Sequence, residues 1–210
     1  MAEMTMEELS TQYFDVLKEL GNIGAGNATT ALAQMLGTKV DMSVPQVKLL
    51  EFKDVGDMMG GAEQIMAGIY LSVEGDITGS IMFLVGQHAA RQLVNMLMGG
   101  GSGASDDEPF NDVEMSALKE VGNIITGSYL NSLSMMTNLK MVPSIPYVCI
   151  DMAGAILSVP AIEFGIMGDK MLLIENQFFD TEALSGYFIF LPDMDGYSKV
   201  LAALGLAQPQ

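Results

Sequence analysis

Two long stretches of the chain, residues 11–35 and 112–136, place apolar residues three or four positions apart. This spacing is typical of an amphipathic helix with one side in the core, so each stretch predicts a long helix. The apolar positions are Leu17, Leu20, Ile23 and Leu32 in the first stretch, and Met115, Leu118, Val121, Ile125 and Leu133 in the second. Asn111, with Glu114 three residues later, predicts a capping box at the start of the second helix.

Shorter apolar runs between turn residues predict strands. The pattern repeats: each long helix is followed by a strand, a short helix, two further strands and a last helix. The predicted strands are 40–50, 64–75 and 78–85 in the first half and 140–150, 169–179 and 186–192 in the second, with last helices at 88–98 and 197–206.

The two predicted long helices carry the same polar residues at the same spacing. Asp15, Glu19 and Asn22 lie on one helical face, because positions i, i+4 and i+7 stand above one another. After a shift of 101 positions they recur as Ser116, Glu120 and Asn123, and the later residues Pro45 and Pro146 keep the same shift.

A single Glu-x-x-Asn on an amphipathic helix is common on a solvated face. Here, however, the polar positions recur where neighbours differ, for example Gly24 against Ile125 and Asn27 against Ser128. This comparison of the chain with itself indicates a duplication through which one polar feature was retained.

The duplication predicts how the chain is organised. The repeats span about residues 8–98 and 111–206, joined by a Gly/Ser/acidic linker at 99–110. Each half has only about three strands, and one shared sheet leaves fewer exposed edges than two small ones. We therefore expect residues 1–210 to form a single pseudo-twofold domain.

The pattern Asp/Ser-x3-Glu-x2-Asn-x22-Pro, complete in both halves, resembles the signature of the CheC/CheX/FliY chemotaxis phosphatases. The resemblance runs from about residue 8 to 206 and includes KLLEF at 48–52. Two complete sites and an end at residue 210 resemble CheC most closely. The resemblance implies an α+β fold, with a six-stranded sheet, two signature helices on one side and sites at opposite ends.

The family resemblance also implies an enzymatic activity, the hydrolysis of the aspartyl phosphate on the response regulator CheY. A receiver domain supplies its own Mg²⁺ and lysine, so the accelerating partner mainly has to place a water in line with phosphorus. Asn22 and Asn123 each offer an acceptor and a donor for that water. Glu19 and Glu120 would contact the receiver's lysine or orient the same water.

The other motif residues have supporting roles in this interpretation. Asp15 and Ser116 differ in chemistry, so a hydrogen bond that orients the Glu or supports the helix suits both better than a shared proton transfer. Pro45 and Pro146 have a fixed φ and no N–H, which predicts an edge strand or a bend beside the helix.

Three glycines, Gly21, Gly24 and Gly26, lie inside the first predicted helix. No predicted strand precedes them, so a nucleotide-binding loop is disfavoured. Glycine within a helix costs about 1 kcal/mol relative to alanine. Because Gly21 and Gly26 recur as Gly122 and Gly127, we expect another backbone to approach closely, from either the opposite repeat helix or the docked receiver.

Composition limits the classes of partner and the cellular compartment that we expect. With 9 basic and 26 acidic residues the net charge is −17, which disfavours nucleic acid and anionic membranes and favours basic partners. Neither an apolar run of about 18–20 residues nor a secretion leader is present, so we expect a cytoplasmic protein without membrane insertion.

His88, at a helix end, and Cys149, in a buried strand, cannot together form a zinc site. We therefore expect no bound cofactor or metal, with Mg²⁺ carried by CheY.

The resemblance implies a second partner, the receptor deamidase CheD. The corresponding segment is 151–157, beginning with Asp151, although an apolar segment there also suits a core helix. A non-catalytic alternative remains, in which the chain sequesters CheD or phosphorylated CheY without turnover.

Overall fold

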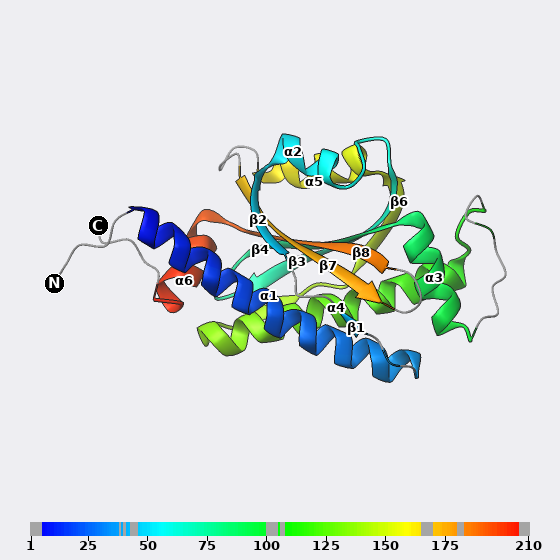
Figure 1. Ribbon diagram of the computed structural model, residues 1–210, viewed down its shortest axis with the longest axis horizontal. Helices are drawn as coiled ribbons and strands as arrows, with labels where there is room; N and C mark the ends of the chain where they lie inside the picture. Colours follow the sequence, from blue (N-terminus) through cyan, green and yellow to red (C-terminus); the bar gives the residue numbers. More distant parts are fainter. Residues whose placement is uncertain are drawn as a thin grey trace.

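The computed structural model describes residues 6–37, 39, 41–42, 46–99, 105, 108–164, 170–179 and 183–205 (Figure 1). Its helices are α1 (Met6–Leu36), α2 (Phe52–Met58), α3 (Gln87–Leu97), α4 (Asp112–Thr137), α5 (Ala153–Phe164) and α6 (Met194–Ala203). Its strands are β1 (Asp41–Met42), β2 (Gln46–Glu51), β3 (Ile65–Gly75), β4 (Gly79–Gly86), β5 (Met141–Pro143), β6 (Tyr147–Met152), β7 (Lys170–Phe179) and β8 (Ala183–Pro192).

The predicted helices are confirmed, with small shifts at their ends. Helix α1 begins at Met6, five residues before the predicted start, and α4 covers its predicted range with one more residue, Thr137. Asn138, in the left-handed region at φ 56°, ends α4. Helix α6 starts at Met194 rather than 197, because the Asp193 side chain accepts a hydrogen bond from the Gly196 N–H and caps the helix there.

All described strands join one antiparallel sheet. The order is β1-β7-β8-β4-β3-β5, with β2 also paired to β7 and β6 also paired to β3. The expectation of six strands is replaced by eight, because each edge position is divided into two strands. One edge contains β1 and β2, both on β7, and the other contains β5 and β6, both on β3.

The interruption between β5 and β6 has a local cause. Pro146 is buried at this break and has no N–H for a ladder bond. Ser144 keeps the segment attached to β3: its N–H donates to the Ser72 carbonyl at 2.8 Å, and its hydroxyl accepts from the Ser72 N–H at 3.0 Å. Of the two predicted alternatives for Pro146, an edge strand or a bend, the edge strand is confirmed, whereas Pro45 lies outside the described residues.

The strand order reads the same from either edge when each strand is replaced by its counterpart in the other repeat. Strands β4 and β8 pair at the centre. At each edge, the outer strands belong to one half of the chain and the strand that they pair with belongs to the other half. The two halves therefore share one sheet. The pseudo-twofold axis and the repeat bounds stay predictions.

Two helical layers cover the sheet, as Figure 1 shows: α1 and α4 on one face, α2 and α5 on the other. Alternate residues of the central strands point to opposite layers, as the pleat requires. Phe83 and Phe188 pack with the α1 and α4 residues, whereas Leu84 and Ile189 pack with α2 and α5. The signature helices thus have one face on the sheet and another free for solvent.

None of the helices in the described part of the chain is both long and apolar enough to cross a membrane.

Candidate functional site: two exposed helix faces

The first candidate site lies on α1. Glu19 is exposed and Asn22 is half-buried, whereas Gly21 and Ala25 are buried. Since α1 turns its apolar side to the sheet, the carboxylate and the amide lie on the side that a partner can reach. The Asp15 side chain lies outside the described part of the structure.

The second candidate site has the same arrangement on α4. Glu120 and Asn123 are both exposed, and the intervening Val121 and Gly122 are buried. In each site the Glu and the Asn lie one turn apart on one helical face. The predicted site residues therefore form two Glu/Asn pairs, one on each signature helix.

The two pairs lie on opposite sides of the helix contact. Helices α1 and α4 are adjacent and run in roughly opposite directions (Figure 1). They meet where Gly24 packs against Tyr129 and where the Asn27 side-chain amide donates to the Ser132 hydroxyl at 3.1 Å. Both contacts come after the Glu/Asn pair in each helix, so the antiparallel directions carry the pairs apart.

Gly24 permits the close packing of the two helices. A Cβ atom built there would lie 2.4 Å from the Tyr129 ring, which stacks on Phe188 with the ring centroids 4.0 Å apart. Gly122 plays a similar part against the sheet, because its Cβ would lie 2.4 Å from the Ile69 side chain. The expected close approach therefore exists at these two glycines, but side chains make it, not another backbone.

Gly26 and Gly127 have no such neighbour. A Cβ at either position would meet nothing within 4 Å, apart from the helix's own backbone. Both adopt ordinary helical φ values, since neither is among the glycines with positive φ. Neither packing nor backbone conformation within the described structure explains them.

Ile23 was expected in the core and is instead 36% exposed. It adjoins Asn22, and the aligned residue of the second repeat, Ile124, is half-buried. The periodicity assigned Ile23 to the wrong side because it lies at the boundary of the apolar stripe. Each Glu/Asn pair therefore has a partly exposed isoleucine beside it.

Ser116 supports the helix. Its hydroxyl donates to the Asp112 carbonyl four residues earlier at 2.8 Å, in the first turn of α4. Of the two expected roles, this hydrogen bond favours support of the helix over orientation of Glu120.

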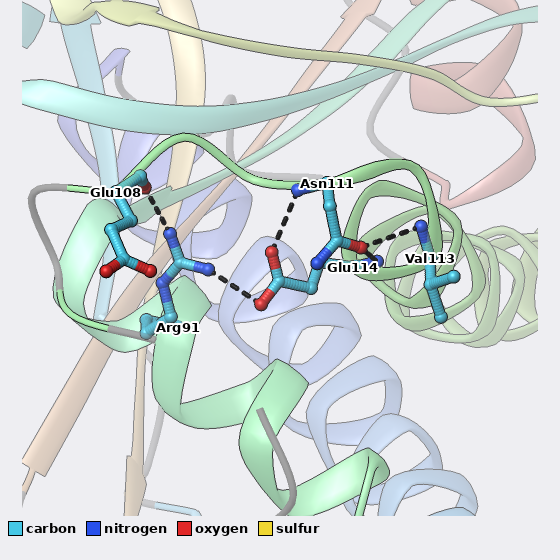
Figure 2. Close-up of polar contacts among 5 residues, drawn as sticks. All are labelled: Arg91, Glu108, Asn111, Val113 and Glu114. Carbon is cyan, nitrogen blue, oxygen red and sulfur yellow. Dashed lines mark hydrogen bonds and ion pairs between the residues drawn. The ribbon is translucent and has the colours of Figure 1, made fainter. Parts of the chain in front are cut away.

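The start of α4 is held by the predicted capping box. The Asn111 side-chain oxygen accepts from the N–H groups of Val113 and Glu114 at 3.0 and 3.1 Å, and the Asn111 N–H donates to the Glu114 carboxylate at 2.9 Å (Figure 2). The prediction from Asn111 and Glu114 is confirmed.

A buried ion pair, which the sequence analysis missed, joins this cap to α3. Arg91 Nη1 lies 2.9 Å from Glu114 Oε1, and the two side chains are only 2% and 1% exposed. The same guanidinium donates from Nη2 to the Glu108 carbonyl at 2.5 Å and lies 3.7 Å from the Phe110 ring centroid. As Figure 2 shows, Arg91 links α3, the segment before α4 and the first turn of α4.

One sequence signal points toward this ion pair. Arg91 lies three residues before the buried Val94, so it shares the inner side of the short helix α3. A buried arginine needs a charged or hydrogen-bonding partner, and Glu114 at a predicted cap was a candidate. The sequence does not show that α3 packs against the start of α4.

The positions of the first repeat that align with this cap do not begin a helix. The positions aligned with Asn111 and Glu114 are Ser10 and Tyr13, and both lie inside α1, which begins at Met6. The polar motif therefore begins nine residues into α1 but only four residues into α4, counting from Met6 to Asp15 and from Asp112 to Ser116.

Asp151, the predicted contact for CheD, is the last residue but one of the edge strand β6. Its side chain is exposed and accepts from the Met152 N–H at 2.7 Å. Apolar side chains in this part of the fold are exposed as well: Met152 and its strand partner Ile65, and Val159 in α5. The following α5 also buries Ala153, Ile156 and Leu157, so the core interpretation of this helix holds for its inner side.

His88 occupies the expected helix end, and Cys149 lies in the expected strand but is less buried than expected. Cys149 is half-buried in β6, and burial, together with the nearby Asp151 charge, raises the pKa of its thiol. His88 is exposed at the second residue of α3. Among the described residues, no group of three or more His, Cys, Asp or Glu side chains is arranged to hold a metal.

Comparison with known proteins identifies the family. The model of the CheC-like family matches residues 15–49 and 113–149, and each segment contains one complete polar motif. The chain is 38% identical over 200 residues to the CheY-P phosphatase CheC of Bacillus subtilis (strain 168), covering 94% of this chain and 96% of that protein. This chain belongs to the CheC-like family.

Solved structures agree with the fold of this CheC-like chain. Thermotoga maritima FliY superposes with a TM-score of 0.73 at 22% identity, covering 99% of this chain and 100% of that one. The CheX–CheY–BeF3–Mg²⁺ complex of Borrelia burgdorferi contains a chain that matches with a TM-score of 0.53 at 17% identity, covering 81% and 95%. At these identities the likeness concerns the fold, a mixed α/β structure with an antiparallel sheet.

Proposed function

We propose that this CheC-like chain is a CheY-P phosphatase that acts in the cytoplasm. One observation carries the proposal: the Glu and Asn of each family motif lie on an accessible face of α1 or α4, in both repeats. The relative from Bacillus subtilis is named a CheY-P phosphatase, which supports the same reaction here.

In the proposed reaction, water attacks the phosphorus of the aspartyl phosphate on CheY. The new bond joins the water oxygen to phosphorus, the bond from phosphorus to the aspartate oxygen breaks, and free phosphate and the aspartate carboxylate result. CheY brings the Mg²⁺ and the lysine that stabilise the charge on the phosphoryl group. The phosphatase then mainly has to position the attacking water and the docked CheY.

Asn22 and Asn123 would position the water. A carboxamide can accept one hydrogen bond from the water and donate another, which leaves a lone pair aimed at phosphorus. The amide does not titrate, so this contribution works without a change of protonation. The partly exposed Ile23 and half-buried Ile124 beside the amides would help to exclude bulk water once CheY has docked.

Glu19 and Glu120 would contact the lysine of CheY. Both carboxylates are exposed one turn before the Asn, so they can reach a basic group on a docked partner. A carboxylate–ammonium contact would fix the receiver's orientation over the amide. The net charge of −17 favours a basic contact surface on CheY.

Turnover separates the phosphatase from a protein that only sequesters CheY. CheY-P decay is followed with this chain at about one-twentieth of the CheY concentration. The proposal predicts that nearly all CheY-P is hydrolysed faster than in its absence. Unchanged decay would refute the phosphatase, and unchanged decay together with binding of CheY-P would favour sequestration.

We also propose CheD as a second partner, which would bind near Asp151, where Ile65, Met152 and Val159 are also exposed. The exposure of these apolar side chains, two of them on the paired ends of β3 and β6, supports this assignment. This surface lies where β6 ends and α5 begins, outside α1 and α4, so CheD and CheY would contact different elements. The test is a Met152→Glu/Val159→Glu variant, which should lose binding to purified CheD and keep phosphatase activity. Unchanged CheD binding would contradict the assignment.

A further inference from the structure

The helix glycines fall into two classes according to what surrounds them. Gly24 and Gly122 face the Tyr129 ring and the Ile69 side chain, so packing inside the protein excludes a larger residue there. Around Gly26 and Gly127 a Cβ would meet nothing within 4 Å, and both have ordinary helical φ values. Alanine would suit both positions better in a helix.

The second class recurs at one place relative to the candidate sites. Gly26 comes four residues after Asn22, and Gly127 comes four residues after Asn123. Each glycine therefore lies on the same face as its amide, about 6 Å farther along the helix axis. Gly26 is exposed and Gly127 is half-buried, so both are accessible from outside.

The direction of a helical side chain determines how a residue at position 26 or 127 would lie relative to the nearby amide. The bond from Cα to Cβ tilts toward the helix N-terminus, and a side chain covers the turn before its own Cα. A side chain at Gly26 would therefore lean over Asn22, and one at Gly127 would lean over Asn123. With glycine there, the space above each amide stays open.

We infer that Gly26 and Gly127 are specificity-determining residues, which leave room for the main chain of the phosphorylated receiver against the helix backbone beside each Asn. This inference rests on the proposed phosphatase function. The Asn side chain is short, so the phosphoryl group and the loop that carries it must come close to the helix for the amide to hold the attacking water. The missing Cβ provides that close approach.

The test is the Gly26→Ala/Gly127→Ala variant, assayed for CheY-P dephosphorylation and for thermal unfolding. The added methyl groups should raise KM for CheY-P about five- to tenfold, because they crowd the docked receiver, and leave kcat within about twofold. Tm should rise by several degrees, because alanine is the better helix former. Leucine at both positions should raise KM further.

The control is the Gln34→Ala/Met135→Ala variant. These residues occupy aligned positions on the same two helices, both are exposed, and both lie farther from the amides. KM for CheY-P should stay within about twofold of the unsubstituted value.

The outcomes separate this inference from the proposed function. No acceleration of CheY-P decay by the unsubstituted chain would refute the phosphatase itself. Acceleration by that chain with an unchanged KM in the alanine and leucine variants would refute only the role of the glycines. A lower Tm in the alanine variant would show that the glycines serve the protein's own packing, which would also overturn the inference.

Discussion

The two candidate sites have similar outer faces but differ in how their helices begin. On α1 and α4 alike, an accessible Glu and Asn lie one turn apart, with a glycine one turn beyond the Asn. Helix α4 begins four residues before its motif, and the Asn111 cap and the buried Arg91–Glu114 pair hold this start. The aligned part of α1 is helix interior.

The inner faces of the helices differ as well. Gly24 accommodates the large Tyr129 side chain of the other repeat, whereas the aligned positions are Ile125 and Ala28, both buried. The larger residue is therefore on α4 in both aligned pairs, but the size difference is smaller between Ala28 and Ile125. The duplication thus kept the outward face with the Glu/Asn pair and varied residues that pack inside the protein. The difference between Gly24 and Ile125 therefore does not by itself make the outward faces unequal.

The largest expected effect comes from removing the Arg91 side chain. Arg91→Ala should destabilise the protein by about 3–5 kcal/mol, because Glu114 would stay buried without a counter-charge. Chemical denaturation measures the free energy of unfolding. Lys199→Ala, which breaks the exposed ion pair with Asp195, is the matched control and should leave the midpoint nearly unchanged.

The same substitution also tests whether the ion pair serves one site more than the other. In an Asn22→Ala background only the α4 site would act, and there Arg91→Ala should lower phosphatase activity, measured well below the unfolding temperature. In an Asn123→Ala background the loss should be smaller. Equal losses would mean that the Arg91–Glu114 ion pair stabilises the whole fold without favouring α4.

The next largest effect is expected at the helix contact. Gly24→Ala should destabilise the protein by about 1–3 kcal/mol, because its Cβ would overlap the Tyr129 ring, which is stacked and buried. Thermal unfolding checks this, with Gly26→Ala as the control on the outer face of the same helix. If both variants gain stability, the close contact between α1 and Tyr129 is wrong.

Periodicity and cap chemistry predicted much of this comparison. Both signature helices, the Asn111–Glu114 cap and the outward direction of the Glu/Asn pairs follow from spacing along a helix, which is local information. Ile23 was misplaced because a residue at the edge of an apolar stripe can lie on either side of the boundary.

Contacts between elements could not be predicted from the sequence. Arg91 and Glu114 meet because α3 lies against the start of α4, and Gly24 meets Tyr129 across the helix pair. Neither distance is encoded in local spacing. The edge strands were predicted as single units, and only the structure shows how Ser144 and Pro146 divide one of them while keeping it attached to β3.

A smaller effect should distinguish the two helix starts. Asn111→Ala should cost about 1 kcal/mol of stability, since two N–H groups of α4 lose their acceptor. Ser10→Ala, at the aligned position inside α1, should cost nothing, because no cap exists there. Comparable losses in denaturation midpoints would contradict the difference between the helix starts.

The smallest effect is expected at Ser116. Ser116→Ala removes a hydroxyl that donates to the Asp112 carbonyl, so it should change the α4 site's rate by less than about threefold in the Asn22→Ala background. A loss of tenfold or more would assign Ser116 a direct part in orienting Glu120 or the water.

The most direct measurement is CheY-P decay with a catalytic amount of the Asn22→Ala/Asn123→Ala variant, beside both single variants. Each single variant should keep the activity of its intact site. The double variant should lose at least about a hundredfold of the acceleration, while its circular dichroism and Tm stay close to those of the unsubstituted chain. Full acceleration by the folded double variant would show that the two amides do not position the water.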